Sequence, residues 1–169
     1  MYHMGWGVDK NLITAFDWYK TASVQGNPRA QYNLAQMYQM GWGVERDPQA
    51  AFKWYTVSAE QGDPRAQFNL GQIYRQRMKN YEAALKWYTL SAEQGVALAQ
   101  YNLALLYGKG FGVKKDYSTA HMWATISNQH GHKEALGIVE ILDDNMTISQ
   151  IRNAKKLLDE CTRKNYINC

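Results

Sequence analysis

The chain of 169 residues is long enough to bury a hydrophobic core and falls in the size range of a single domain. Apolar residues at 46% and charged residues at 20% lie near the averages of globular proteins, which excludes a disordered or collagen-like chain. The net charge of +4 does not indicate a nucleic-acid partner, because Lys and Arg are interspersed with Asp and Glu along most of the chain, whereas a nucleic-acid binder gathers its basic residues on one face or stripe.

The opening segment, Met1-Tyr2-His3, lacks the charged start and apolar core of a signal peptide. No stretch of the chain approaches the roughly 20 apolar residues that span a bilayer. The sequence therefore predicts no membrane insertion.

Three residue types recur along the chain with one rhythm of 36, 33 and 36 residues. They are the glycines Gly26, Gly62, Gly95 and Gly131, the alanines Ala30, Ala66, Ala99 and Ala135, and the tryptophans Trp18, Trp54, Trp87 and Trp123. A period of this length is typical of repeat proteins, so the sequence predicts a stack of similar units.

Each unit contains two helical segments. Ala30, Leu34 and Tyr38 are spaced by four, which places them on one stripe of a first helix. The second segment follows the i, i+3, i+4, i+7 pattern at Ala51, Trp54, Tyr55 and Ser58. We expect small alanines to let the helices approach while Trp and Tyr fill the space beside them.

Glycine and proline mark the turns of each unit. A glycine such as Gly26 follows each second helix, where a left-handed residue is favoured, and Pro28 and Pro64 suit the first turn of the next helix. Gly-x-Gly-Val loops join the two helices at residues 5–8, 41–44 and 110–113. The third unit lacks this loop and is expected to turn through residues 76–79, which explains the short interval.

The second unit reads Ala30, Leu34-Ala35, Tyr38, Gly41-Trp42-Gly43-Val44, Asp47, Ala51, Trp54-Tyr55, Ser58-Ala59 and Gly62. From about Tyr2 to Ala135 the chain resembles the Sel1-like repeat family, relatives of tetratricopeptide repeats with longer loops. The resemblance implies an all-α fold, a right-handed α/α solenoid of helix-turn-helix repeats. We expect one domain over 1–169, with a partial repeat 2–29, repeats 30–65, 66–98 and 99–134, and a degenerate repeat with a capping helix over 135–169.

The first unit begins inside its first helix, because Tyr2 aligns with Tyr38. The helix over residues 12–25 would then expose Trp18 and Tyr19, which is costly at roughly 25 cal/mol per Å² of apolar surface. We therefore expect upstream residues, a partner or a second copy of the chain to cover this face. Self-association through the N-terminal helix is one of these alternatives.

The C-terminal segment opens with a capping box, Thr147 with Gln150, and continues as a helix from Ile148 to about Lys164. Its polar outer face suits a terminal cap. Cys161 and Cys169 form a disulfide if the tail folds back, and are otherwise free thiols. The ending Cys161…Asn165-Tyr166…Cys169 resembles exported bacterial Sel1-like proteins, which implies a periplasmic or secreted location; the alternative is the cytoplasm.

Catalytic and metal-binding motifs are weak. The Gly-x-Gly-Val loops follow helices, whereas a phosphate loop follows a strand, so we interpret them as turns. The pair His130 and His132 has no third ligand at metal spacing, Cys161 lies on an apolar helix face without a base, and no Gly-x-Ser-x-Gly elbow occurs. We expect no enzyme activity, no metal and no cofactor.

The candidate partner-binding residues are the outward positions of the first helices, which line the concave face in tetratricopeptide repeats. They are Tyr32, Gln36, Gln39, Phe68, Gln72, Arg75, Tyr101 and Leu105. Aromatic and polar side chains in this pattern suit a bound helix or extended peptide. The alternative is that the aromatic residues pack against neighbouring first helices. The invariant Asn33, Asn69 and Asn102 are expected to bond the backbone between units.

A second candidate surface consists of the loop aromatics Trp6, Trp42 and Phe111. They either shield the junction between helices or form an edge patch for a partner or a glycan. The first functional hypothesis is a non-enzymatic scaffold or adaptor that binds a protein or peptide, possibly an immunity or envelope-complex protein. The alternative is a glycan- or peptidoglycan-contacting module. An enzyme acting on cell-wall amides is disfavoured, because the relatives linked to penicillin binding carry a cysteine pair in each repeat.

Overall fold

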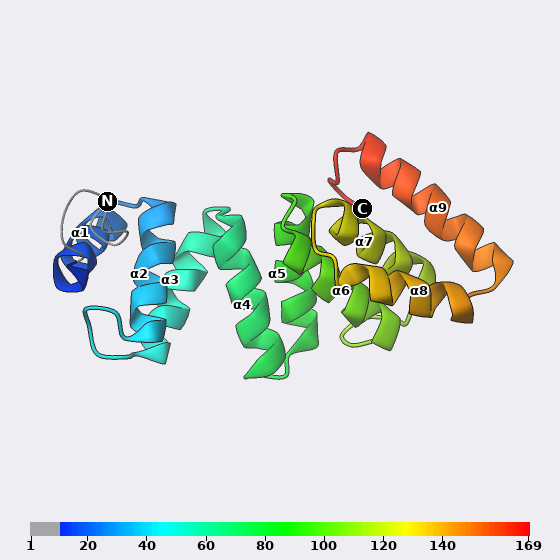
Figure 1. Ribbon diagram of the computed structural model, residues 1–169. Helices are drawn as coiled ribbons and strands as arrows, with labels where there is room; N and C mark the ends of the chain where they lie inside the picture. The colour runs from blue at the N-terminus through cyan, green and yellow to red at the C-terminus, as the bar shows by residue number, and fades with distance from the viewer. Residues whose placement is uncertain (1–10) are drawn as a thin grey trace. The chain divides into compact units, whose positions relative to one another are not determined.

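A computed structural model describes residues 11–169 of the chain. These residues form nine α-helices and no β-strand, which confirms the predicted all-α class (Figure 1). The helices are α1 (Leu12–Val24), α2 (Pro28–Met40), α3 (Pro48–Glu60), α4 (Pro64–Gln76), α5 (Tyr81–Glu93), α6 (Ala97–Lys109), α7 (Tyr117–Gln129), α8 (Ala135–Asn145) and α9 (Ile148–Arg163).

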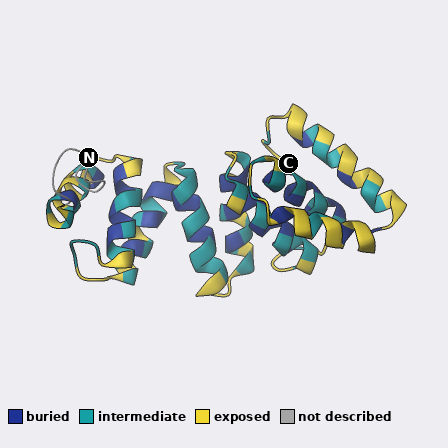
Figure 2. Ribbon diagram, in the orientation of Figure 1, coloured by how far each residue is buried: buried dark blue, intermediate teal, exposed yellow. Residues whose placement is uncertain are grey.

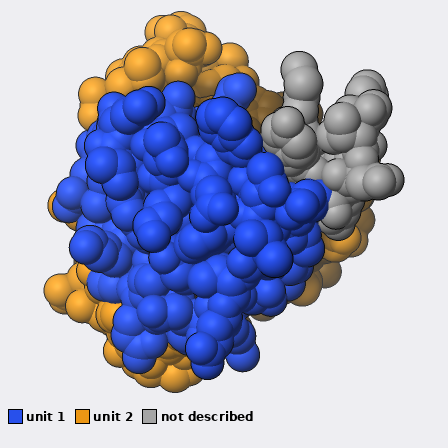
Figure 3. Space-filling model, turned by 90° about the vertical axis from the view of Figure 1, so that its left-hand side faces the viewer, with its two compact units in different colours: residues 1–70 blue, residues 71–169 orange. Residues whose placement is uncertain are grey.

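The chain divides into two compact units, residues 1–70 and 71–169, which are coloured separately in Figure 3. The boundary falls inside α4. In the first unit α2 packs on both α1 and α3. In the second unit α6 packs on α5 and α7, and α7 also packs on α8 and α9. Each unit therefore has helix–helix interfaces of its own.

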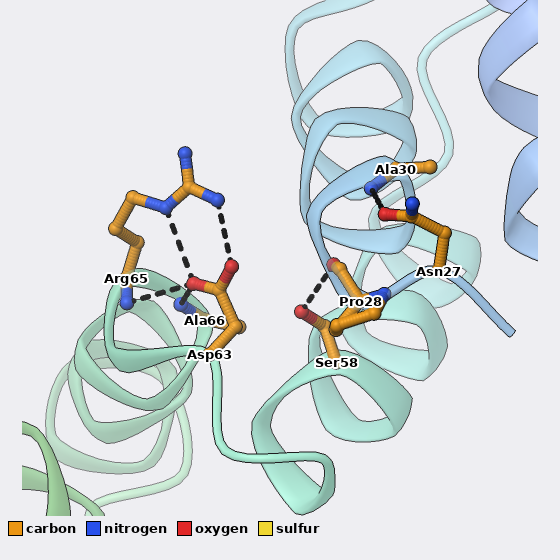
Figure 4. Close-up of polar contacts among 7 residues, drawn as sticks. All are labelled: Asn27, Pro28, Ala30, Ser58, Asp63, Arg65 and Ala66. Atoms are coloured by element: carbon orange, nitrogen blue, oxygen red, sulfur yellow. Dashed lines mark hydrogen bonds and ion pairs between the residues drawn. The ribbon is translucent and has the colours of Figure 1, made fainter.

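Most of the helices begin at a residue whose side chain accepts a hydrogen bond from the first turn. Asn27 accepts from the backbone N–H of Ala30 at 3.0 Å, and Pro28 occupies the first turn of α2 (Figure 4). A proline costs no hydrogen bond there, because the N–H it lacks would have no partner within the helix. Similar side-chain caps occur at Asn11, Asp47, Asn80, Asp116 and Thr147.

The turns also follow the sequence prediction. The glycines after the second helices, Gly26, Gly62, Gly95 and Gly131, all have positive φ angles. In the shortened third repeat α4 ends at Gln76, α5 begins at Tyr81, and Lys79 takes a left-handed conformation with φ 54°. The predicted turn through residues 76–79 is therefore confirmed.

The buried core is built from leucine, alanine and tyrosine at equivalent positions of the repeats (Figure 2). Leu34, Leu70 and Leu103 are 0% exposed, and Tyr55 and Tyr88 are at most 1% exposed. Small side chains at the crossing points allow these larger groups to interlock at the density of a protein interior. The alanines Ala30, Ala51, Ala66, Ala84, Ala99 and Ala120 are all buried.

In two of the repeats the tryptophan of the second helix is less buried than the sequence pattern predicted. Trp54 and Trp87 are only half-buried, while the tyrosines that follow them are fully buried. Successive helical residues point about 100° apart, so both rings cannot face the core, and tyrosine takes the inner position. Trp123 is buried, and Trp18 on α1 is 62% exposed, as the sequence predicted.

The C-terminal helix α9 packs on α7 through one face and exposes the other (Figure 2). Its capping box is complete: the Thr147 N–H donates to Gln150 Oε1 at 2.9 Å, and the Gln150 N–H donates to Thr147 Oγ1 at 3.3 Å. Ala154 and Cys161 are buried on its inner face. These features confirm the predicted cap.

The tail beyond α9 folds back, and Cys161 forms a disulfide with Cys169. The Asn168 N–H donates to a Glu93 carboxylate oxygen at 2.8 Å, and the Tyr166 ring lies edge-on to His130 with centroids 4.9 Å apart. Of the two alternatives, a disulfide or two free thiols, the structure therefore has the disulfide.

The two Gly-x-Gly-Val loops within the described residues, 41–44 and 110–113, pack closely against the start of a second helix. At Gly43 an added Cβ would overlap the carbonyl group of Leu12, and at Gly112 it would lie 2.5 Å from the carbonyl carbon of Tyr81. The second glycine of the loop thus permits close approach of two backbones, which supports the interpretation of these loops as turns.

A pair of glycine variants separates this close approach from backbone strain. Gly41 and Gly43 have nearly the same φ, 74° and 71°, but a Cβ at Gly41 meets no atom closer than 3.6 Å. We expect Gly41→Ala to lower the free energy of unfolding by about 1 kcal/mol, the cost of a left-handed alanine. Gly43→Ala should cost at least about 2 kcal/mol more, measured by urea denaturation. Equal losses would contradict the packing role of Gly43.

Candidate functional site

In the first unit the predicted contact residue Tyr32 is enclosed by its neighbours. The Arg65 guanidinium lies 4.2 Å from the centre of its ring, and the Tyr55 ring lies 5.9 Å away. Burial raises the pKa of Tyr32, although Arg65 and hydrogen bonds with Asn69 and Gln36 act to lower it. Tyr32 therefore packs against the next first helix, α4, and remains half-buried.

The neighbouring glutamines also serve internal contacts. Gln36 bonds Tyr32, and Gln39 Oε1 accepts a hydrogen bond from the Tyr55 hydroxyl at 2.6 Å. Burial raises the pKa of Tyr55, so this hydroxyl stays protonated and remains a donor. Phe68, on α4, is half-buried. These residues hold the repeat together as well as facing outward.

Arg65 is positioned by Asp63, which caps α4 (Figure 4). The Asp63 carboxylate accepts from Arg65 Nη2 at 2.6 Å, from Arg65 Nε at 3.2 Å, and from the Arg65 and Ala66 backbone N–H groups at 2.9 and 3.2 Å. Burial acts to raise the pKa of Asp63, but these bonds outweigh it and hold the pKa below its ordinary value. The same close-up shows the Ser58 hydroxyl donating to the Pro28 carbonyl at 2.8 Å.

In the second unit two predicted contact residues, Arg75 and Leu105, line one hollow of about 170 Å³. Phe111 of the predicted loop patch lines it as well, so the structure brings members of both predicted sets together. The other lining residues are Gln76, Lys79, Tyr81, Leu106 and Lys109. Three cationic side chains and no acidic one line this space, which we name the basic hollow.

Two aromatic rings stand at the basic hollow. Tyr81 and Phe111 stack with centroids 4.8 Å apart, and Phe111 is 43% exposed. Lys109 Nζ lies 6.0 Å from the Phe111 ring centre. Arg75 Nε is buried without a hydrogen-bond partner. Burial raises the pKa of the Tyr88 hydroxyl, although the Arg75 guanidinium acts to lower it.

An apolar hollow of about 330 Å³ adjoins the basic one, because Leu105 and Lys109 line both. It lies between α6 and α8. Its remaining lining is Ala104, Gly108, Tyr117, Ile138, Ile141, Leu142 and Asn145. Ile141 is 64% exposed, which leaves apolar surface at this hollow available to a partner.

The other predicted residues of this unit have different surroundings. Gln72 is half-buried on α4. Tyr101 on α6 lies edge-on to His132, with centroids 4.7 Å apart, so it packs against the segment leading into the next repeat. Like Tyr32, it fills a junction between repeats.

Among the loop aromatics, Trp42 and Phe111 differ in how far they are exposed. Trp42 is half-buried and borders a small space of about 10 Å³ together with Tyr19, Asn33 and Met37. This placement fits the shielding role. Phe111 is the more exposed of the two. Trp6 lies outside the described residues.

The expected backbone bonds from the invariant asparagines are wrong in two repeats. Asn102 donates to the Leu98 carbonyl of its own helix at 2.7 Å, and Asn69 bonds the side chain of Tyr32. A carbonyl one turn earlier is the nearest acceptor for an asparagine in a helix.

The histidines have partners other than a metal. His130 Nδ1 lies 3.1 Å from Gln100 Oε1, and His132 Nδ1 lies 3.3 Å from a Glu134 carboxylate oxygen. Across residues 11–169, no three His, Cys, Asp or Glu side chains gather as metal ligands. In the part of the chain that the structure describes, no helix combines the length and apolar character needed to cross a membrane.

Comparison with known protein families finds a match over most of the chain. The family model of the Sel1 repeat matches residues 1–27, 28–63, 64–96 and 97–132. The chain belongs to the Sel1 repeat family. Sel1 repeats generally mediate protein–protein interaction, and their fold, an all-α solenoid, is typically a non-enzymatic scaffold. The matched repeats begin two residues before the repeats 30–65, 66–98 and 99–134 expected from the sequence.

Solved Sel1 structures from bacteria are similar to this chain. A Sel1 repeat protein from Oxalobacter formigenes is 38% identical with a TM-score of 0.77, over 82% of this chain and 58% of its own. A protective antigen of uropathogenic Escherichia coli strains with an SLR fold is 27% identical with a TM-score of 0.57, over 98% and 45%. The chain thus spans about half the length of these relatives.

A Pseudomonas aeruginosa immunity protein aligns at 22% identity over 90% of this chain and 72% of its own. Its TM-score is 0.42. A search of curated proteins finds no match.

Sequence reasoning missed several residues of the two hollows. Lys79, Tyr81 and Lys109 were not predicted as contact residues, because they lie at the ends of helices and in the shortened turn. Ile138 and Ile141 lie in the degenerate repeat, where no repeat pattern marks outward positions. A signal existed for Lys109, which lies one turn after Leu105 on the same face of α6.

The Asp63 network predicts a pH-dependent contribution to stability. The folded pKa of Asp63 is below its ordinary value, so its contribution is present above the ordinary pKa and is lost as the pH falls through the folded one. Asp63→Asn keeps a capping side chain but removes the charge. We expect it to lower the free energy of unfolding by about 1 kcal/mol at neutral pH.

At pH values below the folded pKa of Asp63, this difference from wild type should vanish in urea denaturation. As a control, Asp17→Asn on the exposed face of α1 should change stability by less than about 0.5 kcal/mol at either pH. A loss from Asp63→Asn that is the same at neutral and acidic pH would contradict the role assigned to the ion pair.

Proposed function

We propose that this chain is a non-enzymatic scaffold or adaptor that holds a segment of a partner protein on the first helices of its repeats. The observation that supports the proposal is the pair of adjoining hollows on α6, which share Leu105 and Lys109. Ligand sites are commonly concave, mostly apolar and fitted with a few convergent polar groups. This combination occurs here on a first helix.

The predicted contact residues divide into two roles in this proposal. Arg75 and Leu105 contact the partner directly, because they line the basic hollow. Gln72 lies one turn before Arg75 on α4 and extends the same surface. Residues with internal partners hold the surface in shape and contact the partner only at their exposed edges; they are Tyr32, Gln36, Gln39, Phe68 and Tyr101.

An exported location fits the disulfide. The bond between Cys161 and Cys169 requires an oxidising compartment to persist, such as the bacterial periplasm or the extracellular space. A periplasmic or secreted adaptor, an envelope-complex subunit or an immunity protein would meet that condition.

Self-association through α1 is a further part of the proposal. Ile13, Trp18 and Val24 on this helix are 67%, 62% and 74% exposed. Apolar side chains exposed on one helix favour an apolar partner surface, and a second copy of the chain offers one.

The alternative function is contact with a glycan or peptidoglycan. Phe111, stacked on Tyr81 and partly exposed, supports it, because sugars bind to flat aromatic faces. This reading predicts weak binding to peptidoglycan fragments that is lost in Phe111→Ala or Trp42→Ala and kept in Gln72→Ala.

Site-specific photocrosslinking tests the scaffold proposal. A photoreactive phenylalanine analogue replaces Leu105 in one variant and the exposed Lys86 of α5 in a matched control, and both are expressed in the native cells. We expect a discrete protein adduct from position 105 and none of that size from position 86. Adducts equal at the two positions, or none at position 105, would overturn the proposal.

A further inference from the structure

The two hollows on α6 differ in chemistry: one is lined by cationic side chains and the other mostly by apolar ones. Together they indicate which side chains a bound partner carries. Resting on the proposed function, we infer that the bound segment is an acidic peptide in which an Asp or Glu side chain lies beside an aliphatic one. The carboxylate enters the basic hollow, and the aliphatic side chain enters the apolar hollow between α6 and α8.

The basic hollow has cationic groups that lack an acidic partner. Among the described residues, Arg75, Lys79 and Lys109 form no ion pair with a carboxylate, and no acidic side chain lines the hollow. Arg75 Nε is also buried without a hydrogen-bond acceptor. A buried donor left unsatisfied is costly, and a carboxylate is the acceptor that a guanidinium pairs with best.

The aromatic side chains at the basic hollow strengthen its preference for a carboxylate. Tyr81 and Phe111 stack and present apolar surface to the hollow. Lys109, which lies near the Phe111 ring, is on the wall that both hollows share. A charge interaction beside apolar walls is less weakened by water than one on open surface.

The apolar hollow selects the neighbouring side chain. Ile138, Ile141 and Leu142 from α8 face Leu105 from α6 across it. Because Ile141 is largely exposed, a bound Leu, Ile or Val would remove apolar surface on both molecules from water. Asn145 and Lys109 are the polar side chains at this hollow besides the Tyr117 hydroxyl.

The apolar hollow favours a peptide over a nucleic acid. A phosphate could occupy the basic hollow, but a nucleic acid has no aliphatic side chain for the space between α6 and α8. Along most of the sequence, Lys and Arg are also interspersed with Asp and Glu. A peptide supplies both groups within a few residues.

Selection of peptides on the folded protein tests the inference. Random linear peptides displayed on phage are selected on the disulfide-bonded wild-type chain, and the affinities of the best synthetic peptides are then measured. We expect enrichment of Asp or Glu near Leu, Ile or Val. Arg75→Gln and Lys109→Gln should each weaken binding about tenfold, and Ile141→Ser should remove the preference for an aliphatic side chain.

Two matched controls on the same unit report on general damage. Lys86→Gln removes a cation that stacks on Trp87 outside the hollows, and Leu136→Ser removes an exposed aliphatic side chain of α8 that does not line them. Both should bind the peptides within about twofold of wild type. Circular dichroism and thermal unfolding confirm that each variant is folded.

Selected peptides without acidic residues would overturn the inference, as would affinities unchanged in Lys109→Gln and Ile141→Ser. Displacement of the peptide by an oligothymidine of similar charge would overturn it too, in favour of a phosphate site. If the crosslink from position 105 instead maps to a partner segment without an acidic residue, the scaffold function stands and this inference fails. If position 105 gives no crosslink at all, both the scaffold function and this inference are contradicted.

Discussion

A buried glutamine in each repeat sets the distance between neighbouring helices. Gln31, Gln67 and Gln100 are 2%, 4% and 0% exposed, and each side-chain amide donates to a backbone carbonyl near the end of the preceding helix. The acceptors are the carbonyls of Ser23, Ala59 and Ala92, at 3.1, 3.2 and 2.9 Å. A buried amide must be satisfied, so the helices can approach only in the register that supplies these acceptors.

Two of these glutamines, Gln31 and Gln100, also bond a residue at the end of the second helix of their own repeat. Gln31 Oε1 accepts from Gln61 Nε2 at 2.7 Å, and Gln100 Oε1 lies 3.1 Å from His130 Nδ1. One side chain therefore joins three helices. The outward face of α6, away from Gln100, carries Leu105 and Lys109, which line the two hollows.

Features fixed by local chemistry could be predicted from the sequence. The capping box at Thr147, the proline that opens α2, the glycine turns and the shortened turn before Tyr81 depend on a few consecutive residues, and the structure has them where the sequence predicted them. Gln31, Gln67 and Gln100 also keep the 36- and 33-residue intervals. A glutamine directly after Ala30, Ala66 and Ala99, on the predicted buried stripe, was the signal that could have predicted their role.

Features that depend on contacts between helices could not be predicted. Periodicity cannot decide whether Trp54 or Tyr55 turns inward, and it does not reveal that Arg65 covers Tyr32. The hollows on α6 combine residues from the end of α4, the turn after it and the degenerate repeat. Arg75 and Leu105 were found as outward positions, but the cations and isoleucines around them required the packed structure.

Replacement of Gln100 by leucine tests the register constraint most directly. Gln100→Leu keeps the volume nearly constant but leaves the Ala92 carbonyl and His130 without their partner. The free energy of unfolding in urea should fall by about 2 kcal/mol, whereas Gln129→Leu on the exposed face of α7 should change it by less than about 0.5 kcal/mol. A Gln100→Leu protein as stable as wild type would contradict the central role given to the buried glutamines.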